Sequence, residues 1–128
     1  MASEVTPNTL VKILRLALPG SKIGWGDRLG WEHQDCVNEG PKAIQSLGRS
    51  KLRIRVELLW SQDGGARTCA RILRPGGYVF EEFGDVYDFS HADLHDPRRC
   101  AEKISDTISM KLRTLADDIN GLADMFQG

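Results

Sequence analysis

Apolar residues recur at intervals of three and four over the last third of the chain. The positions are Ala101, Ile104, Ile108, Leu112, Leu115, Ile119, Leu122 and Phe126. This spacing places side chains on one face of a helix. Asp96 supplies a capping side chain and Pro97 a favourable first helical residue, so a helix is predicted from Pro97 to Asn120. Its length would be roughly 36 Å against about 30 Å for a nine-residue strand, so part of the stripe is expected to overhang the sheet.

A shorter helix is predicted near the N-terminus. Thr6 and Pro7 repeat the pairing of a capping residue with a proline at the first helical position. Pro19 and Gly20 are expected to end this helix. Its buried face is expected to contain Leu10, Val11, Ile13, Leu14 and Ala17.

The segment from residue 19 to residue 50 is rich in Gly and polar residues and shows weak periodicity. It is expected to form a long connection, with at most a short turn of helix from Lys42 to Leu47. A connection of this length is usually functional or disordered. The segment is therefore a place to look for a binding loop.

Strict alternation of apolar and polar residues begins at Leu52 and predicts a strand that ends near Trp60. Its apolar face contains Leu52, Ile54, Val56, Leu58 and Trp60. Its polar face carries Arg53, Arg55 and Glu57. This alternation predicts a sheet with one buried face.

Two further strands are predicted after this one. A hairpin turn at Ser61–Gly65, where Asp-Gly-Gly tolerates positive φ, leads into Ala66–Arg74. A second turn at Pro75–Gly77 leads into Tyr78–Phe83, which is expected to continue irregularly to Phe89. The pattern predicts one α+β domain over residues 1–128, with an N-terminal helix, a long loop, a three- to four-stranded antiparallel meander and a long C-terminal helix. Both helices are expected to pack on the apolar face and to leave the arginine face open.

Composition narrows the class of protein. The 128 residues carry 17 Lys and Arg against 18 Asp and Glu, for a net charge of −1. Because the net charge is close to zero, neither nucleic acid nor an anionic membrane surface is an expected partner. Three widely spaced cysteines do not form a disulfide framework, and no apolar run is long enough for a signal peptide or a membrane span. A reducing cytoplasm is the expected compartment, or a virion in which the protein is assembled.

The polar face of the predicted sheet is the first candidate interface. Arg53, Arg55 and Arg71 lie on it, and Lys51, Arg67 and Arg74 add to a cationic strip. Binding of nucleic acid would require exposed aromatic rings among these cations, whereas Trp60 falls on the apolar face. Contact with protein and a solvated face with cross-strand Arg–acid pairs both stay open.

Two further features of the sequence belong to this interface hypothesis, an acidic cluster and an apolar tail. The acidic cluster consists of Glu81, Glu82, Asp85, Asp88, Asp93 and Asp96. It is interpreted as a solvated loop or as the half of an interface that receives the basic face. The tail residues Leu122, Met125 and Phe126 follow an Asn120-Gly121 stop and are predicted to form a subunit contact.

Trp25, Arg28 and Trp31 are the candidate ligand-binding residues. They belong to two Gly-Trp units, in which glycines allow close backbone approach and tryptophans offer stacking faces. The competing interpretation, which the burial statistics of tryptophan favour, is that both tryptophans anchor the loop onto the core. The spacing matches neither a phosphate-binding loop nor a dinucleotide fingerprint.

A metal site is the next possibility that the sequence raises. Its potential ligands are His33, Cys36, His91, His95 and Cys100. No CxxC or HExxH pair is present, so neither a metal nor a cofactor is expected. Cys100 lies in the first turn of the last helix beside two arginines, which favours a lowered thiol pKa, whereas burial as a small apolar side chain is the more common role.

The chain contains no nucleophile elbow, paired-carboxylate motif or cofactor fingerprint, so an enzyme is not expected. Its layout of helix, long loop, meander and helix resembles small ring-forming neck and tail-terminator proteins of tailed phages, which implies a structural role in virion assembly. We therefore expect a non-catalytic assembly or interaction subunit whose partner is protein, either a homo-oligomer or a larger complex. The alternative is a small ligand- or target-binding protein, such as a viral counter-defence inhibitor, that uses the Gly-Trp loop and the arginine face.

Overall fold

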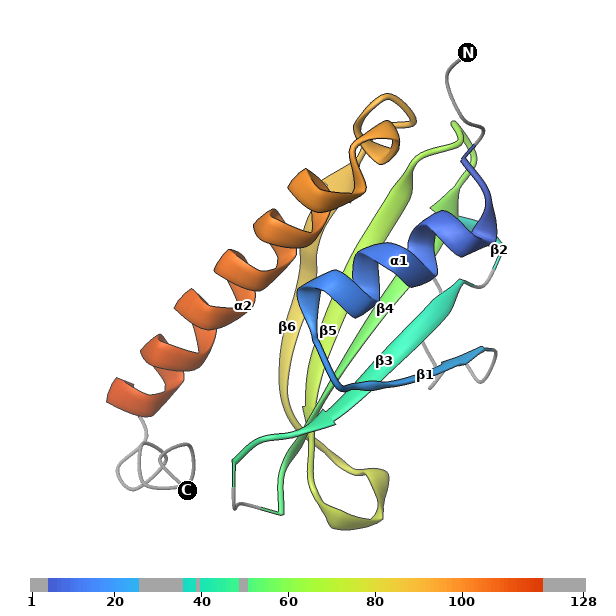
Figure 1. The fold of residues 1–128 in the computed structure, drawn as a ribbon. Coiled ribbons are helices and arrows are strands. Elements are labelled where there is room, and N and C mark those ends of the chain that lie inside the picture. Colours follow the sequence, from blue (N-terminus) through green and yellow to red (C-terminus); the bar gives the residue numbers. More distant parts are fainter. Residues whose placement is uncertain (1–4, 26–35, 39, 49–50, 119–128) are drawn as a thin grey trace.

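The computed structural model describes residues 5–25, 36–38, 40–48 and 51–118, which form two α-helices and a six-stranded antiparallel sheet (Figure 1). The helices are α1 (Pro7–Ala17) and α2 (Pro97–Asp118), with short 3-10 turns η1 (Pro75–Gly77) and η2 (Asp93–His95). The strands are β1 (Lys22–Trp25), β2 (Cys36–Asn38), β3 (Pro41–Ser46), β4 (Arg53–Ser61), β5 (Ala66–Leu73) and β6 (Val79–Phe89). The predicted α+β class and the order of helix, sheet and helix are confirmed.

The segment predicted as a long connection instead adds strands to the sheet. The strand order is β1-β3-β4-β5-β6, and β2 pairs separately with β4. β3 replaces the helical turn expected at Lys42–Leu47, because Ala43 pairs with Val56 of β4 and is fully buried. Pairing with a neighbouring strand decides this conformation, and such long-range pairing leaves little periodicity in a six-residue strand. The sheet is therefore wider than the predicted meander of three or four strands.

The predicted meander itself is confirmed as β4, β5 and β6. Ile54, Val56 and Leu58 are buried on one face of β4, as the alternation requires. β6 runs without interruption from Val79 to Phe89, and its pairing with β5 contains three register shifts. These bulges account for the irregularity expected after Phe83, because each one reverses the alternation of side chains.

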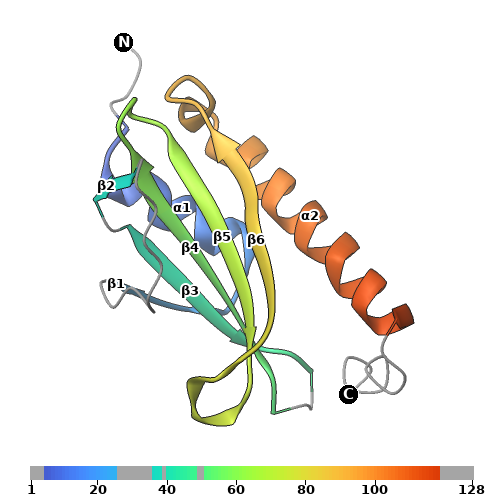
Figure 2. The same ribbon diagram turned by 180° about the vertical axis from the view of Figure 1, so that it is seen from behind.

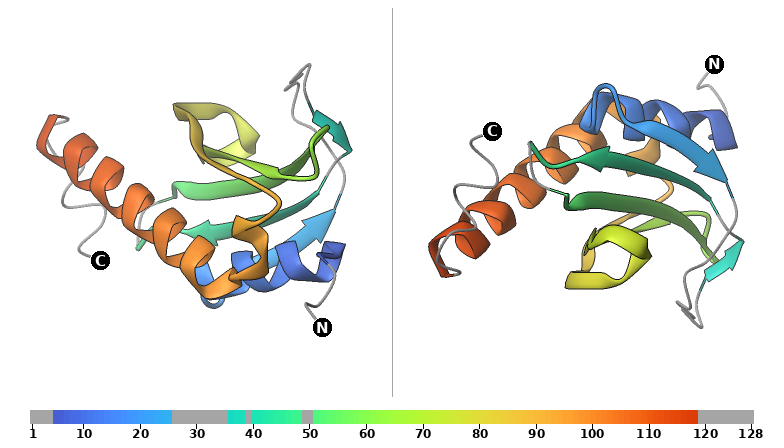
Figure 3. Two further views of the ribbon diagram at one scale, coloured as in Figure 1. Left: turned by 90° about the horizontal axis from the view of Figure 1, so that it is seen from above. Right: turned by 90° about the horizontal axis from the view of Figure 1, so that it is seen from below.

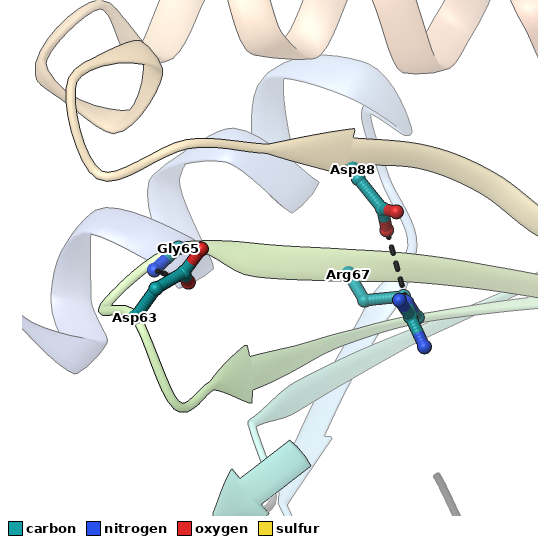
Figure 4. Close-up of polar contacts among 4 residues, drawn as sticks. All are labelled: Asp63, Gly65, Arg67 and Asp88. Carbon is teal, nitrogen blue, oxygen red and sulfur yellow. Dashed lines mark hydrogen bonds and ion pairs between the residues drawn. The ribbon is translucent and has the colours of Figure 1, made fainter. Parts of the chain in front are cut away.

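The turn between β4 and β5 has the geometry expected for an Asp-Gly-Gly sequence (Figure 4). The Asp63 Oδ1 atom accepts a hydrogen bond of 3.0 Å from the backbone N–H of Gly65, and Gly64 has a φ of 85°. A Cβ atom at Gly65 would lie 2.2 Å from the carbonyl oxygen of Phe89. Only glycine fits at this position, which brings the turn against the end of β6.

Both helices pack on the apolar face of the sheet, as predicted (Figures 1 and 2). α1 contributes Leu10, Ile13 and Leu14 to the core, and α2 contributes Ala101, Ile104 and Ile108. α1 lies across the strands, whereas α2 runs beside β6 (Figure 2). The opposite face carries no helix and is called the helix-free face below.

The caps and the overhang of α2 agree with the sequence pattern. The Asp96 Oδ1 atom accepts a hydrogen bond of 3.4 Å from the Arg99 N–H at the start of the helix. Ile104 and Ile108 are buried, but the next stripe residue, Leu112, is only partly buried. Figure 1 shows the C-terminal end of α2 diverging from β6. Leu122, Met125 and Phe126, predicted to form a subunit contact, lie outside the described residues.

Candidate interaction surface

The helix-free face of β4 and β5 is polar along most of its length. Strand register places Arg55 opposite Arg71, Glu57 opposite Cys69, and Leu59 opposite Arg67. On the neighbouring strands, Lys42 pairs with Glu57, while Glu82, Asp85 and Asp88 pair with Arg71, Cys69 and Arg67. The fold therefore brings the acidic residues of β6 into register with the basic side of β5.

The middle of this face is a buried centre formed by Arg55, Glu57, Cys69 and Arg71. Arg55 and Glu57 are each 5% exposed, and Arg71 is 9% exposed. The Arg55 Nη2 atom donates a hydrogen bond to Glu57 Oε1, two residues along the same strand. Burial of charge is tolerated when the charges are paired in this way.

The expectation that the arginine face is open to solvent is wrong for Arg55 and Arg71. Both residues lie opposite each other on the two central strands, and Ile44 of β3 and Glu82 of β6 flank this pair in register. A position with strands on both sides leaves less of a side chain to solvent than a position at a strand end. Arg53, by contrast, is exposed. The predicted interface role of Arg53, Arg55 and Arg71 stays a prediction, and only Arg53 of the three offers its charge to solvent.

At the end of the face near the β4–β5 turn, Arg67 forms an ion pair with Asp88 across the strands (Figure 4). The Arg67 Nε atom lies 3.0 Å from Asp88 Oδ1, and the Asp88 side chain is mostly exposed. A recess of about 420 Å³ beside this pair is lined by Ser61, Gln62, Asp63, Arg67, Asp88, Phe89 and Ser90. The predicted pairing of basic and acidic residues thus occurs, at this position, within one chain.

At the opposite end of the sheet lie the residues that we call the hairpin-end surface: Lys51, Arg53, Arg74, Tyr78 and Val79. Arg53, Leu73 and Val79 form one row across β4, β5 and β6. The Arg74 N–H donates a hydrogen bond of 2.6 Å to the Tyr78 carbonyl oxygen, which closes the turn. Tyr78 is 75% exposed and Val79 is 44% exposed.

Three cations belong to the same end of the sheet, Lys51 and Arg53 at the start of β4 and Arg74 after the end of β5. Lys51, Arg53 and Arg74 are all exposed, and within the described ranges none of them forms an ion pair. The Arg74 guanidinium carbon lies 4.9 Å from the centre of the Phe80 ring, which packs against the core on the helix side of the sheet. Figure 3 shows η1 on the side of the sheet opposite the helices, so the hairpin tip projects past the helix-free face. Sequence reasoning predicted the turn at Pro75–Gly77 but missed Tyr78 and Val79 as surface residues, because a turn signal does not tell how exposed the following side chains are.

Trp25, one of the candidate ligand-binding residues, lies at the end of edge strand β1. It pairs in register with Pro41 and is 51% exposed. The expectation that Trp25 is a core anchor is therefore wrong, because an edge strand has a neighbour on one side only. Arg28 and Trp31 lie outside the described residues, so a shared site stays a prediction.

The histidines and cysteines do not gather into one described site. The rings of His91 and His95 are in edge contact, with centroids 5.1 Å apart. Within residues 5–25, 36–38, 40–48 and 51–118, no three His, Cys, Asp or Glu side chains form a group that could hold a metal ion. His33 and the side chain of Cys36 lie outside the described part of the chain.

Cys100 is buried between η2 and the start of α2. Its thiol donates a hydrogen bond to the Asp93 carbonyl oxygen, with a sulfur–oxygen distance of 3.2 Å. Burial, followed by the negative charges of Asp93 and Asp96, raises the thiol pKa from 9.0 to about 11. The lowered pKa considered for a reactive thiol is therefore wrong, and Cys100 has the more common role of a small buried side chain.

Compared with known proteins, the chain matches no family model, no curated protein and no solved structure. Among the described residues, neither helix has both the length and the apolar composition needed to cross a membrane.

Proposed function

We propose that this chain is a non-catalytic assembly subunit that binds protein, as a homo-oligomer or within a larger complex, through its hairpin-end surface. The observation that carries the proposal is the 75% exposure of Tyr78 at the same end of the sheet as three exposed cations, for which the described structure shows no ion pair. Tyrosine and arginine are enriched among the residues that dominate the energy of protein interfaces.

The backbone of the hairpin tip favours a role in recognition. The Arg74–Tyr78 hydrogen bond and the left-handed Gly76 and Gly77 define a compact turn. A preformed turn loses less conformational entropy on binding than a flexible loop does. The buried centre is nearly inaccessible to solvent, so the tip is the better candidate for contact with a partner.

The proposal extends to a structural role in a virion or in its cytoplasmic assembly. Its support is the resemblance in layout to the ring-forming neck and tail-terminator proteins of tailed phages. A layout is weak support for function compared with a site. The hairpin-end surface therefore carries the argument, and the resemblance suggests the setting.

A second candidate function is binding of a small ligand or a macromolecular target, as a viral counter-defence inhibitor would do. The half-exposed Trp25 favours it, because an indole at a sheet edge offers a stacking face. Replacing Trp25 by Ala would abolish such binding without changing the oligomeric mass. The two functions are thus separable by one variant.

The test of assembly is the absolute mass in solution, measured by light scattering over a range of concentrations. We expect a mass above that of the monomer, and we expect the double variant Arg53→Glu/Arg74→Glu to lower it. The matched control is Lys12→Glu/Arg15→Glu, which reverses two exposed charges on α1. A mass that is the same for both variants and the unaltered protein would contradict assembly through the hairpin-end surface.

A further inference from the structure

Strand β1 forms one edge of the sheet. The strand order begins with β1, so within the described residues β3 is its only hydrogen-bonded neighbour. The other edge strand, β6, has α2 beside it, whereas α1 lies over the face of the sheet and not beside β1 (Figures 1 and 2). The free side of an edge strand presents N–H and C=O groups with which another strand can pair.

A proline on β3 decides which peptide groups of β1 point to the free side. Register places Trp25 opposite Pro41. Opposite residues of an antiparallel pair alternate between pairs that exchange two hydrogen bonds and pairs that exchange none. Because proline has no N–H, the Trp25–Pro41 pair is of the second type. The next pair, Gly24 with Lys42, is therefore the one that is hydrogen-bonded between β1 and β3.

The same alternation makes Ile23, like Trp25, a residue that does not bond to β3. The N–H and C=O groups of Ile23 and Trp25 therefore point away from β3, so each residue offers one donor and one acceptor on the free side. Ile23 packs against the core on the helix side of the sheet, and Trp25, two residues along, is 51% exposed. Gly24 lies on the opposite face, beside the Lys42 side chain.

This arrangement is complementary to itself about a twofold axis at Gly24. Two antiparallel β1 strands related by that axis place Ile23 of each copy opposite Trp25 of the other, and each of these pairs exchanges both of its hydrogen bonds. The two Gly24 residues then meet on the axis as a pair without hydrogen bonds, with Cα atoms about 4.5 Å apart. Each pair also sets an indole beside an isoleucine on one face, which is a favourable cross-strand contact.

We propose that β1 is a dimerisation edge, on which the β1 strand of a second copy pairs antiparallel to join the two sheets. A second copy is the occupant because one twofold axis satisfies all the outward peptide groups of Ile23 and Trp25 at once. The contact is isologous and closes at two copies. This inference goes beyond the proposed function, because it uses the main chain of β1 and leaves both hairpin-end surfaces free for another contact.

The first test traps the twofold contact with a disulfide in the full chain. The atom nearest to a Cβ atom at Gly24 would be Lys42 Cε, at 3.2 Å in a flexible side chain, so Gly24→Cys is compatible with the fold. Cα atoms about 4.5 Å apart are within the range that a disulfide spans. Incubation with oxidised glutathione is therefore expected to convert Gly24→Cys into a covalent dimer, seen on a non-reducing gel.

Lys22→Cys is the matched control, because it places a thiol on the same face of the same strand but away from the axis. We expect it to give at least tenfold less covalent dimer than Gly24→Cys. If Gly24→Cys gives no more dimer than Lys22→Cys, the β1 edge does not pair with its own copy. A strand of another protein would then be the remaining occupant, and the proposal would be overturned.

The second test removes the outward N–H of Trp25. Trp25→Pro lacks this donor, and an edge strand tolerates proline where the N–H faces away from the sheet. Trp25→Ala removes the same indole but keeps the N–H. We expect Trp25→Pro to weaken dimerisation at least tenfold more than Trp25→Ala does, measured by sedimentation equilibrium, with similar melting temperatures for the two variants. Equal dimerisation of both would contradict pairing through the main chain.

The disulfide also separates this inference from the proposed function. Arg53→Glu/Arg74→Glu, added to Gly24→Cys, is expected to leave the covalent dimer intact, because the hairpin-end surface is not part of the contact. Loss of the dimer in this combined variant would overturn an independent β1 contact. If the hairpin-end changes leave the mass of the unaltered cysteine background unchanged while Gly24→Cys still forms the dimer, the proposed function is wrong and the β1 contact stands.

Discussion

The buried centre and the hairpin-end surface belong to the same sheet, yet their basic residues differ in burial and in pairing. Arg55 and Arg71 are buried, and Arg55 is paired with Glu57. Arg53 and Arg74 are exposed and have no ion pair within the described structure. Two residues of separation along β4 are enough to change an arginine from part of the packing to a charge in solvent.

This difference shows that the position of an arginine in the sheet decides what its charge can do. A charge in the middle of the sheet must be compensated within the fold, because desolvation of an unpaired ion is costly. A charge at the end of a strand keeps its hydration and remains available to another molecule. The buried centre is therefore expected to control stability, and the hairpin-end surface is expected to control association.

The largest effect is expected from breaking the buried pair. Glu57→Leu leaves the Arg55 guanidinium buried without this partner, and we expect the free energy of unfolding to fall by about 3 kcal/mol. Urea denaturation measures this change. Arg55→Met/Glu57→Leu removes both charges and is expected to recover most of the loss, whereas Arg53→Met is expected to change stability by less than about 0.5 kcal/mol. Equal effects of Arg53→Met and Glu57→Leu would contradict the distinction between the two regions.

Truncation of the exposed tyrosine tests the expectation that the hairpin-end surface controls association. Tyr78→Ala removes the ring most exposed at the hairpin end, and we expect association to weaken at least tenfold, or about 1.4 kcal/mol. The melting temperature is expected to stay within a few degrees of the unaltered protein, because an exposed ring adds little to the core. Light scattering and thermal unfolding give the two readouts. A large fall in melting temperature with intact association would show that Tyr78 belongs to the packing.

The Arg67–Asp88 pair is intermediate between the two regions, since it is paired but partly exposed. A double-mutant cycle with Arg67→Ala and Asp88→Ala is expected to give a coupling energy of about 0.2 to 1 kcal/mol, as for other exposed ion pairs. The coupling should decrease in 1 M salt. A coupling above about 2 kcal/mol would place this pair with the buried centre instead.

The smallest effect on stability at neutral pH is expected from the Cys100 thiol, a buried group that lies outside the helix-free face. Its raised pKa means that the folded protein holds the thiol proton more tightly than the unfolded chain does. The resulting stabilisation is complete below pH 9 and is lost as the pH rises toward 11. We expect thermal unfolding between pH 8 and pH 11 to show a smaller loss of stability in Cys100→Ala than in the unaltered protein. Parallel curves for the two proteins would mean that the thiol is not desolvated.

Periodicity and capping allowed much of this fold to be predicted. The alternation from Leu52 to Trp60 predicted β4 and its buried face, and the caps at Thr6 and Asp96 predicted the starts of both helices. These signals are local, because hydrogen bonds and burial within one element produce them. The strands β1, β2 and β3 were missed, since they are short and form by pairing with strands distant in sequence.

The sequence by itself determined the two amphipathic helices, the central meander and the presence of basic and acidic residues on one face of the sheet. Only the tertiary structure decided which of those charges are compensated, because that depends on the neighbours that β3 and β6 bring to each position. It also decided that Tyr78 and Val79 are exposed at the same end of the sheet as Arg53, which is distant from them in sequence, and as Arg74, which shares no pattern with Arg53. Local periodicity determines which face of a strand is apolar, whereas burial of a polar side chain depends on every strand beside it.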